Sequence, residues 1–392
     1  MGGALASRAR QLRPSADGPP RSLRVRRSPE RGRLDAAGGR SRCGEQPDRL
    51  EYGALWLVPG RREPRERARA TRQDVLPPIM SAVLAPSPAP WPHRLALAMV
   101  VAAIPLLLFG GSVTSLEAGM AIDGWLVLER GRGDHFLFFY PVEKWFRDVG
   151  TFVEHTHRLF GSLVGFLAIG TVVATFLGRR RRAERALAAA ALAAVCAQGA
   201  VGGFRVLENS PSLAFLHGAF GQAVFALLAA TAVGLSPRWG AAEAAAPRER
   251  TDLGRLALGT CGFVYSAVFL GAWLRHSETP SALAAHLVGM LVAATSVLAL
   301  ARGLKAGAQD EGGRPELRSA RARLVALLSV QLALGVLSFL VLYVRAAPAV
   351  QELHDSLFPT LHVLFGALLL AQCVVCAMWS GRWAPSVVGG RA

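Results

Sequence analysis

Cysteine is scarce in this sequence. There are five among 392 residues: Cys43 lies in the N-terminal tail, and the others lie in long apolar runs, at Cys196, Cys261, Cys373 and Cys376. No loop between these runs carries a pair of cysteines, so we expect no structural disulfide. Cys373 and Cys376 have the spacing of a redox or metal pair, but their place deep inside the last apolar run favours a packing role.

Acidic residues are also few. The chain has 27 of them against 44 Lys and Arg, which gives a formal net charge of +17. A charge of this size can serve nucleic-acid binding, but its distribution argues against that function. Residues 1–79 hold 18 Arg against nine acids, and the other basic residues lie mostly in short loops between apolar runs. This pattern is typical of membrane topology signals, so we expect no nucleic-acid partner.

The first 79 residues lack any apolar periodicity. They are rich in Arg, Gly and Pro, which predicts a disordered basic extension. Nine acids argue against a mitochondrial transit peptide. Met80 opens a short polar start followed by a membrane helix, and the simplest hypothesis is that the natural chain starts there. The extension 1–79 would then not be native.

The rest of the chain lacks the alternation of apolar and polar stretches that a soluble protein shows. It has eight apolar runs of about 20 residues, each long enough to cross roughly 30 Å of hydrocarbon. The runs are 93–113, 152–177, 186–204, 212–235, 253–274, 281–301, 322–344 and 358–380. We therefore predict an all-α polytopic membrane protein with eight transmembrane helices and the lipid bilayer as its main partner.

A weak internal repeat divides these runs into two halves, 93–235 and 253–380. The order of polar residues is the same in both. The first half has His157, Gln198 and His217, and the second has His286, Gln331 and His362. This order predicts two pseudo-symmetric four-helix bundles, related by an axis along the membrane normal.

Four of the nine histidines fall in the first turns of the even-numbered runs, at His157, His217, His286 and His362. The alternation of runs puts all four at one depth, as one pair in each half. A single histidine at a helix mouth can simply reach toward the interface. Four at matched depth indicate function, because ionisable groups inside membranes are costly.

Two facing imidazoles are the axial ligands that haem iron takes in helix bundles. Zinc normally adds a carboxylate or a thiolate, and no second such ligand is evident. A glycine follows each histidine by three or four residues, at Gly161, Gly221, Gly289 and Gly366. These glycines could leave room for a flat macrocycle, although helix packing also uses glycine.

Glu154 precedes His157 by three residues and shares its helical face. A carboxylate beside a haem edge could take protons or stabilise developing positive charge. It could equally be a helix-start anion or a partner of Arg158. Arg158 is in turn a candidate for binding a haem propionate.

These residues resemble a known family, haem A synthase. The matching stretches are GGSVTSLEAGMAIDGW at 110–125, EHTHRLFGSLVGF at 154–166, QGAVGG at 198–203 and LHGAFGQ at 216–222, followed by His286 and His362. The resemblance runs from about residue 93 to 380. It implies a membrane oxidoreductase with eight helices in two bundles, which oxidises a ring methyl of haem O to the formyl group of haem A for terminal oxidase assembly.

The resemblance also implies roles for single residues. Glu154 matches the catalytic acidic residue, and His157 and His217 match the pair at the substrate haem. His286 and His362 match the axial ligands of a bound haem b, whose iron is the cofactor. The implied partners are haem O, the enzyme that produces it and an electron acceptor that the sequence does not identify, and a homo-oligomer stays open.

Two departures from the family pattern concern the loop 114–151. It contains no cysteine where many members have a pair, so we expect a cysteine-free subtype without an electron route through that pair. It also reads Asp123-Gly124-Trp125 where relatives tend towards Asp-Trp-Pro. The second departure leaves the packing of the loop open.

Two other functions remain as alternatives. A bis-histidine membrane cytochrome b for electron transfer would hold two haems without a substrate, and it predicts haems near both membrane faces. A transporter without haem would use the histidines as a proton relay.

The basic loops predict a cytoplasmic location for both termini, in a bacterial inner membrane. The inner loops and C-terminal tail hold 17 Lys and Arg, against seven in the outer loops. A reporter fused to the C-terminus should therefore be active only in the cytoplasm. A fusion active only outside it would contradict the topology and the outer position of the four histidines.

Overall fold

The computed structural model describes residues 90–245, 252–310, 315–344 and 351–380. All of them lie in one compact unit, Leu76–Ala392. The predicted extension 1–79, the start at Met80 and Cys43 fall outside the described residues.

Eight helices in the described residues are long and apolar enough to cross a membrane, so the predicted fold class is confirmed. The first four are α2 (Trp91–Ser115), α4 (Val149–Leu177), α5 (Arg182–Glu208) and α6 (Pro211–Gly234). The second four are α8 (Asp252–Ser277), α9 (Pro280–Asp310), α10 (Pro315–Phe339) and α11 (Gln351–Ser380). A short helix, α7 (Pro237–Ala245), follows α6, and a π-helical turn, Leu340–Val344, extends α10.

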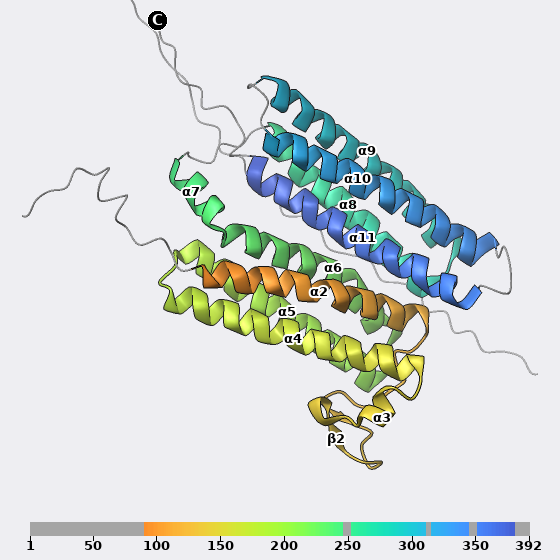
Figure 1. Cartoon of the computed structure of the whole chain (residues 1–392). Coiled ribbons are helices and arrows are strands. Elements are labelled where there is room, and N and C mark those ends of the chain that lie inside the picture. Colours follow the sequence, from red (N-terminus) through yellow and green to blue (C-terminus); the bar gives the residue numbers. More distant parts are fainter. Residues whose placement is uncertain (1–89, 246–251, 311–314, 345–350, 381–392) are drawn as a thin grey trace, which may run out of the picture. The chain divides into compact units, whose positions relative to one another are not determined.

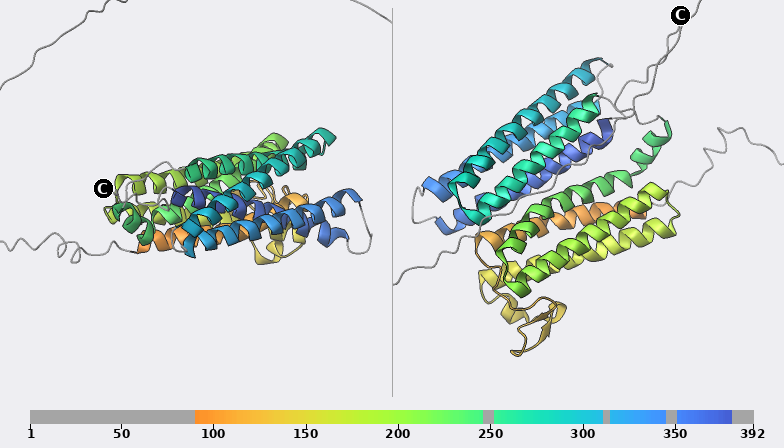
Figure 2. Two further views of the ribbon diagram at one scale, coloured as in Figure 1. Left: turned by 90° about the horizontal axis from the view of Figure 1, so that it is seen from above. Right: turned by 180° about the vertical axis from the view of Figure 1, so that it is seen from behind.

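The helices form two closed groups of four (Figures 1 and 2). In the first half α2 packs on α4, α4 on α5, α5 on α6 and α6 back on α2. The second half repeats this ring with α8, α9, α10 and α11. The halves meet where α11 contacts α2 and α6, and where α6 contacts α8.

Local sequence signals set the helix ends near the histidines. Asp148 caps α4, because its side chain accepts a hydrogen bond from the Thr151 amide at 2.8 Å. Ser210 caps α6 in the same way, and Pro211 fits the first turn. Asn209 ends α5 in the left-handed conformation, so α5 and α6 are joined by a tight reversal.

One apolar core runs through both halves. It contains Met99 of α2, Leu228 of α6, Leu300 of α9 and Cys373 of α11, all at most 2% exposed. Hydroxyls within the helices bond the carbonyl four residues earlier, as Thr171 does with Leu167. The four described cysteines are free thiols, and Cys373 and Cys376 are fully buried core residues.

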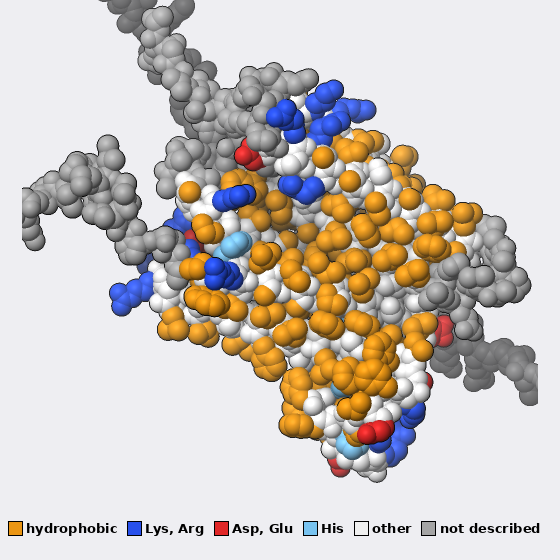
Figure 3. Space-filling model, in the orientation of Figure 1, with side chains coloured by type: hydrophobic (Ala, Val, Ile, Leu, Met, Phe, Trp, Pro, Cys, Tyr) orange, Lys and Arg blue, Asp and Glu red, His pale blue; other side chains and the backbone are white. Residues whose placement is uncertain are grey.

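The surface is that of a membrane protein. Figure 3 shows hydrophobic side chains over most of one helical face, with Lys and Arg concentrated toward the end where α9 ends and α10 begins. The opposite end is where α4, α6, α9 and α11 begin, and we call it the histidine end. There the two halves are joined by hydrogen bonds: Ser115 of α2 contacts Thr360 of α11 at 3.2 Å and accepts one from Arg275 of α8.

The connection between α2 and α4 is a small folded element at the histidine end. Strands β1 (Val127–Leu128) and β2 (His135–Phe136) pair antiparallel, and a 3₁₀ turn (Leu137–Phe139) and helix α3 (Val142–Trp145) follow. Ile122, Leu128, Leu137 and Tyr140 form its own buried cluster. The sequence interpretation treated this segment only as a loop.

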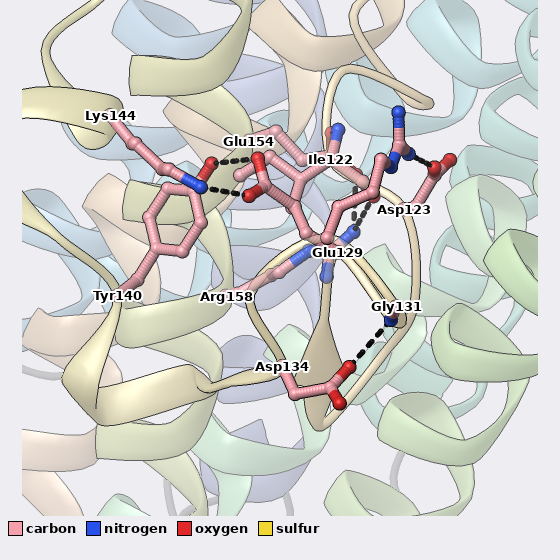
Figure 4. Close-up of polar contacts among 10 residues, drawn as sticks. Ile122, Asp123, Glu129, Gly131, Asp134, Tyr140, Lys144, Glu154 and Arg158 are labelled. Atoms are coloured by element: carbon pink, nitrogen blue, oxygen red, sulfur yellow. Dashed lines mark hydrogen bonds and ion pairs between the residues drawn. The ribbon is translucent and has the colours of Figure 1, made fainter.

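A polar triad stabilises this element (Figure 4). Tyr140 donates to Glu129 at 3.0 Å, and Lys144 donates to the other carboxylate oxygen. The hydrogen bond from Lys144 lowers the pKa of Glu129. Burial, together with the bond to Glu129, raises the pKa of Tyr140 from 10.0 to about 12.

We expect the phenol of Tyr140 to lose its proton at a higher pH than an ordinary tyrosine does. A raised pKa favours the neutral phenol in the folded state, so its stabilising effect is complete below pH 10.0 and lost as pH rises through about 12. The ultraviolet titration of wild type minus that of Tyr140→Phe should show a phenolate step near pH 12. A difference step near pH 10.0 would mean that the triad does not form.

Candidate functional site

His157 of α4 lies against α2. Its Nδ1 is 3.0 Å from the carbonyl oxygen of Leu106, and its ring lies over Gly110. A Cβ on Gly110 would come within 2.7 Å of the imidazole Cε1, a separation that real side chains do not reach. Only glycine therefore lets the ring approach the helix this closely.

His217 of α6 lies on α5 in the same manner. A Cβ on Gly202 would come within 2.7 Å of its Cε1. Its Nδ1 is 3.1 Å from the Gln198 amide nitrogen, which also donates to the His217 carbonyl at 2.5 Å. The rings of His157 and His217 face each other with centroids 6.2 Å apart and planes at 83°.

The second half repeats this arrangement. His286 of α9 lies on Gly271 of α8, where a Cβ would meet its Cε1 at 2.9 Å, and its Nδ1 is 3.1 Å from the Ala267 carbonyl. His362 of α11 lies on Gly335 of α10, where the corresponding distance is 3.0 Å. The two rings have centroids 6.3 Å apart and planes at 85°.

Gln331 contacts both nitrogens of the His362 ring. Its backbone carbonyl is 3.2 Å from Nδ1, and its side-chain amide nitrogen is 3.2 Å from Nε2. The buried amide oxygen of Gln331 has no hydrogen-bond partner within the described residues. Gln331 and Gln198 correspond in the two halves, as the sequence repeat predicted.

A common rule underlies the four sites. Each histidine lies on a glycine near the end of the preceding helix, and the residue four positions before that glycine contacts Nδ1. In three sites the contact is a backbone carbonyl, so Nδ1 carries the proton and donates it. At these three sites Nε2 then keeps its lone pair, which is the form that binds a metal, although at His362 this nitrogen also contacts the Gln331 amide. At His217 the Gln198 amide donates to Nδ1 instead, so Nδ1 holds the lone pair there.

The four glycines under the rings are not those that the sequence interpretation chose. Gly221 and Gly366 were expected to leave room for a macrocycle. A Cβ added to Gly221 would lie 3.2 Å from the side-chain amide nitrogen of Gln198, and one added to Gly366 would lie 3.2 Å from that of Gln331. The glycines on which the rings lie precede their histidines and belong to other helices: Gly110, Gly202, Gly271 and Gly335. The sequence feature that could have identified them is a glycine in the last turns of every odd-numbered apolar run.

Glu154 and Arg158 face the 116–148 loop (Figure 4). One Glu154 oxygen accepts from the Ile122 amide at 2.8 Å, and the other accepts from Arg158 at 2.6 Å. Arg158 also donates to the carbonyls of Ile122 and Gly124, at 3.0 and 2.8 Å, and to that of Trp125 at 3.4 Å. The pair is buried and holds the first part of the loop on α4.

The other polar residues of this stretch hold the second part of the loop. The His155 ring is 4.9 Å from that of Tyr140 and 5.0 Å from that of Trp145. Thr156 accepts a hydrogen bond from the Trp145 indole at 3.1 Å. Among the polar side chains from Glu154 to Arg158, only His157 faces the imidazole of His217.

Trp125 extends the contact from the loop to α5. Its indole lies on Gly203, where a Cβ would come within 2.3 Å of the ring, and its centroid is 6.4 Å from that of Phe204. Gly203 directly follows Gly202, on which His217 lies. The loop therefore reaches from α4 to α5 at the histidine end.

The two halves differ at the positions beside the histidine. Glu154 and Arg158 stand three residues before and one residue after His157, whereas Leu283 and Leu287 stand at these positions around His286. At these two positions a carboxylate and a guanidinium therefore accompany His157 but not His286. The described residues also hold no cluster of three or more His, Cys, Asp or Glu that could bind a metal ion by itself.

The segment that holds the first histidine pair is similar to a known protein family. The model of the COX15-CtaA family, described as cytochrome oxidase assembly protein, matches residues 144–281. Residues 144–281 are therefore similar to this family, which is the family that the sequence motifs predicted.

The matched segment holds Glu154, His157, Arg158 and His217, and it ends just before His286. Assignment of the second pair therefore depends on its geometry and on the internal repeat. No curated protein matches the chain.

We expect Arg158 to be essential for ordering the loop. In Arg158→Ala the loop loses its hydrogen bonds to a buried charged group, each of which contributes about 1.5–3 kcal/mol. Trypsin should then cut at Arg130 or Arg132 at least about tenfold faster than in wild type. Arg255→Ala, which removes an exposed ion pair with Asp252, is the control. Equal cleavage rates in both variants would show that Arg158 does not hold the loop.

Proposed function

We propose that this protein is a haem A synthase, which oxidises a ring methyl of haem O to the formyl group of haem A. The observation that carries the proposal is the pair of facing imidazoles in each half, with ring centroids 6.2 and 6.3 Å apart. The family match supports a role in the same assembly process.

The residues fit a haem between each pair. An imidazole nitrogen lies about 2.0 Å from a bound metal. Two axial imidazoles on one iron therefore place their ring centres roughly 6 Å apart, close to both separations found. Two imidazoles are too few for a zinc site, and the described residues supply no further ligands. The remaining ligands must come from the bound group, as they do in a porphyrin.

The asymmetry between the halves supports different roles for the two pairs. His157 and His217 would hold the substrate haem O, because Glu154 and the loop stand beside them. His286 and His362 would hold a resident haem b among apolar neighbours. When bound, that haem would supply one-electron chemistry. Electrons would leave to an acceptor outside the chain.

Glu154 is the carboxylate best placed to serve the first pair. Conversion of a methyl to a formyl group, with water as the source of the oxygen atom, releases protons together with the electrons, and the protons need an acceptor close to the reacting carbon. Glu154 is buried, shares a helical face with His157, and has both oxygens held in place by Ile122 and Arg158. A carboxylate fixed in this way would meet developing positive charge without reorganisation.

A bis-histidine cytochrome b fits the structure less well. Such a protein carries electrons across the membrane between haems near its two faces. Here both pairs lie toward the histidine end, where Ser115 links α8 and α11. The protein spans the membrane many times, and we propose an inner-membrane location with haem O delivered by the enzyme that makes it.

Haem extraction tests the function directly. Haem would be extracted and separated chromatographically from cells that make haem O, with and without this protein. Haem A should appear only in cells with the protein. Haem O alone in both samples, with the protein present in the membrane, would refute the proposal.

We expect Glu154→Gln to fold, retain bound haem and stall. Loss of one general acid–base group costs about 100- to 10,000-fold in rate, so haem A should nearly vanish while haem O accumulates. Because Glu154 also bonds the loop, trypsin cleavage at Arg130 should be measured on the same sample. Near-normal haem A, or a loss that merely parallels loop opening as in Arg158→Ala, would leave Glu154 with a structural role.

Glycine substitution tests the second pair. Gly271→Ala places a Cβ within 2.9 Å of the His286 ring, so the ring must move and resident haem should be lost. Gly262→Ala lies on the same helix with nothing within 4 Å of the added atom, and it should retain haem. The low-spin haem absorbance of the purified proteins measures the difference. A full haem complement in Gly271→Ala would contradict the assignment.

A further inference from the structure

Each histidine pair has one arginine a single turn closer to the histidine end. Arg205 follows Gly202 by three residues, and Arg275 follows Gly271 by four. Residues three or four apart share a helical face. Each arginine therefore lies one turn closer to the histidine end than the glycine under the imidazole, on the same face of the same helix.

Arg158, the arginine that the sequence suggested for an acidic ligand, is committed elsewhere. Four of the five N–H groups that an arginine carries are directed at Glu154 and at the carbonyls of Ile122, Gly124 and Trp125. Recruiting Arg158 to another anion would release the loop. Its propionate role stays a prediction that its observed partners disfavour.

Arg205 is different, because it has a charge without a bonded partner. The guanidinium of Arg205 makes no hydrogen bond or ion pair within the part of the chain that the structure describes, and the backbone carbonyl of this residue accepts from the Ser210 amide. Its guanidinium lies against Gly119, where a Cβ would come within 1.7 Å of Nη2. Gly119 thus supplies the space that this half-buried group occupies.

The charge of Arg205 acts on the first histidine pair. It interacts electrostatically with both His157 and His217, and with the buried Glu154. Glu154 forms no hydrogen bond with Arg205 in the described residues, and its two oxygens accept from Ile122 and Arg158 instead. A half-buried guanidinium with five donors and no acceptor favours an incoming anion.

We propose that Arg205 binds a propionate carboxylate of the haem held by His157 and His217. This inference depends on the proposed function, because it takes the ligand of that pair to be a haem. The planar guanidinium matches a carboxylate in two parallel hydrogen bonds. Arg205 is thus a positioning residue that orients the macrocycle, and with it the methyl to be oxidised.

The test compares two probes on the purified full-length protein: ferric protoporphyrin IX and its dimethyl ester, which lacks the carboxylate charges. Binding at the first pair is followed by difference spectra. Wild type should prefer the diacid by about 10- to 100-fold, the range expected for charge-assisted hydrogen bonds. Arg205→Ala should lose this preference while its affinity for the ester stays unchanged.

Arg205→Lys keeps the charge but not the two parallel bonds, so it should retain only part of the preference. Arg132→Ala is the matched control, because it removes one exposed positive charge at the same end of the protein, and it should behave as wild type. Unaltered absorbance of the resident haem verifies that each variant is folded.

Other outcomes overturn the inference. An undiminished diacid preference in Arg205→Ala shows that another group binds the propionate, and loss of that preference in Arg158→Ala alone identifies Arg158. If Arg205→Ala binds both probes more weakly by the same factor, Arg205 has a packing role. Equal wild-type affinity for both probes, with less anionic lipid copurifying in Arg205→Ala, assigns a lipid phosphate as the anion. Absence of any haem binding at the first pair in wild type refutes the proposed function itself.

Discussion

The contact on which this protein depends is an imidazole ring lying on a helical glycine. Inside a bilayer no water is available for the second ring nitrogen, so its proton must find a protein acceptor. A backbone carbonyl one turn before the glycine provides one, as Leu106 does for His157. Close approach is possible only without a side chain at the crossing, which explains the glycine. The same contact orients the ring and leaves Nε2 available to a metal.

Four imidazoles lying on helical glycines build the two pairs; three of them donate to a backbone carbonyl, and His217 contacts the Gln198 amide instead. Each half brings one imidazole from each of two helices to a separation of 6.2 or 6.3 Å. The separation is set by the backbone, since glycine fixes how closely each ring lies to its neighbouring helix. The repeated four-helix unit thus provides two similar arrangements of facing imidazoles, and the differences between the two sites come from the residues around each pair.

Those differences explain why one stretch of α4 is so polar. Glu154 and Arg158 hold residues 122–125, and His155 and Thr156 contact Tyr140 and Trp145. The residues that hold the loop and His157 of the first pair are therefore neighbours on α4. In the second half leucines replace Glu154 and Arg158, and no comparable folded loop forms within the described residues. A pair beside a buried carboxylate and a folded loop suits a substrate, and a pair without these two features suits a resident group.

The sequence by itself determined the eight spans, the division into halves and the four histidines, because hydrocarbon thickness fixes run length and polar residues in such runs are rare. It could not choose the glycines, since Gly161 and Gly110 are equally apolar in sequence and only helix packing decides which lies under His157. Nor could it give Arg158 its acceptors, because they belong to a loop whose fold arises from its own small core. Tertiary structure decided these points, since a hydrogen bond depends on where a distant carbonyl lies.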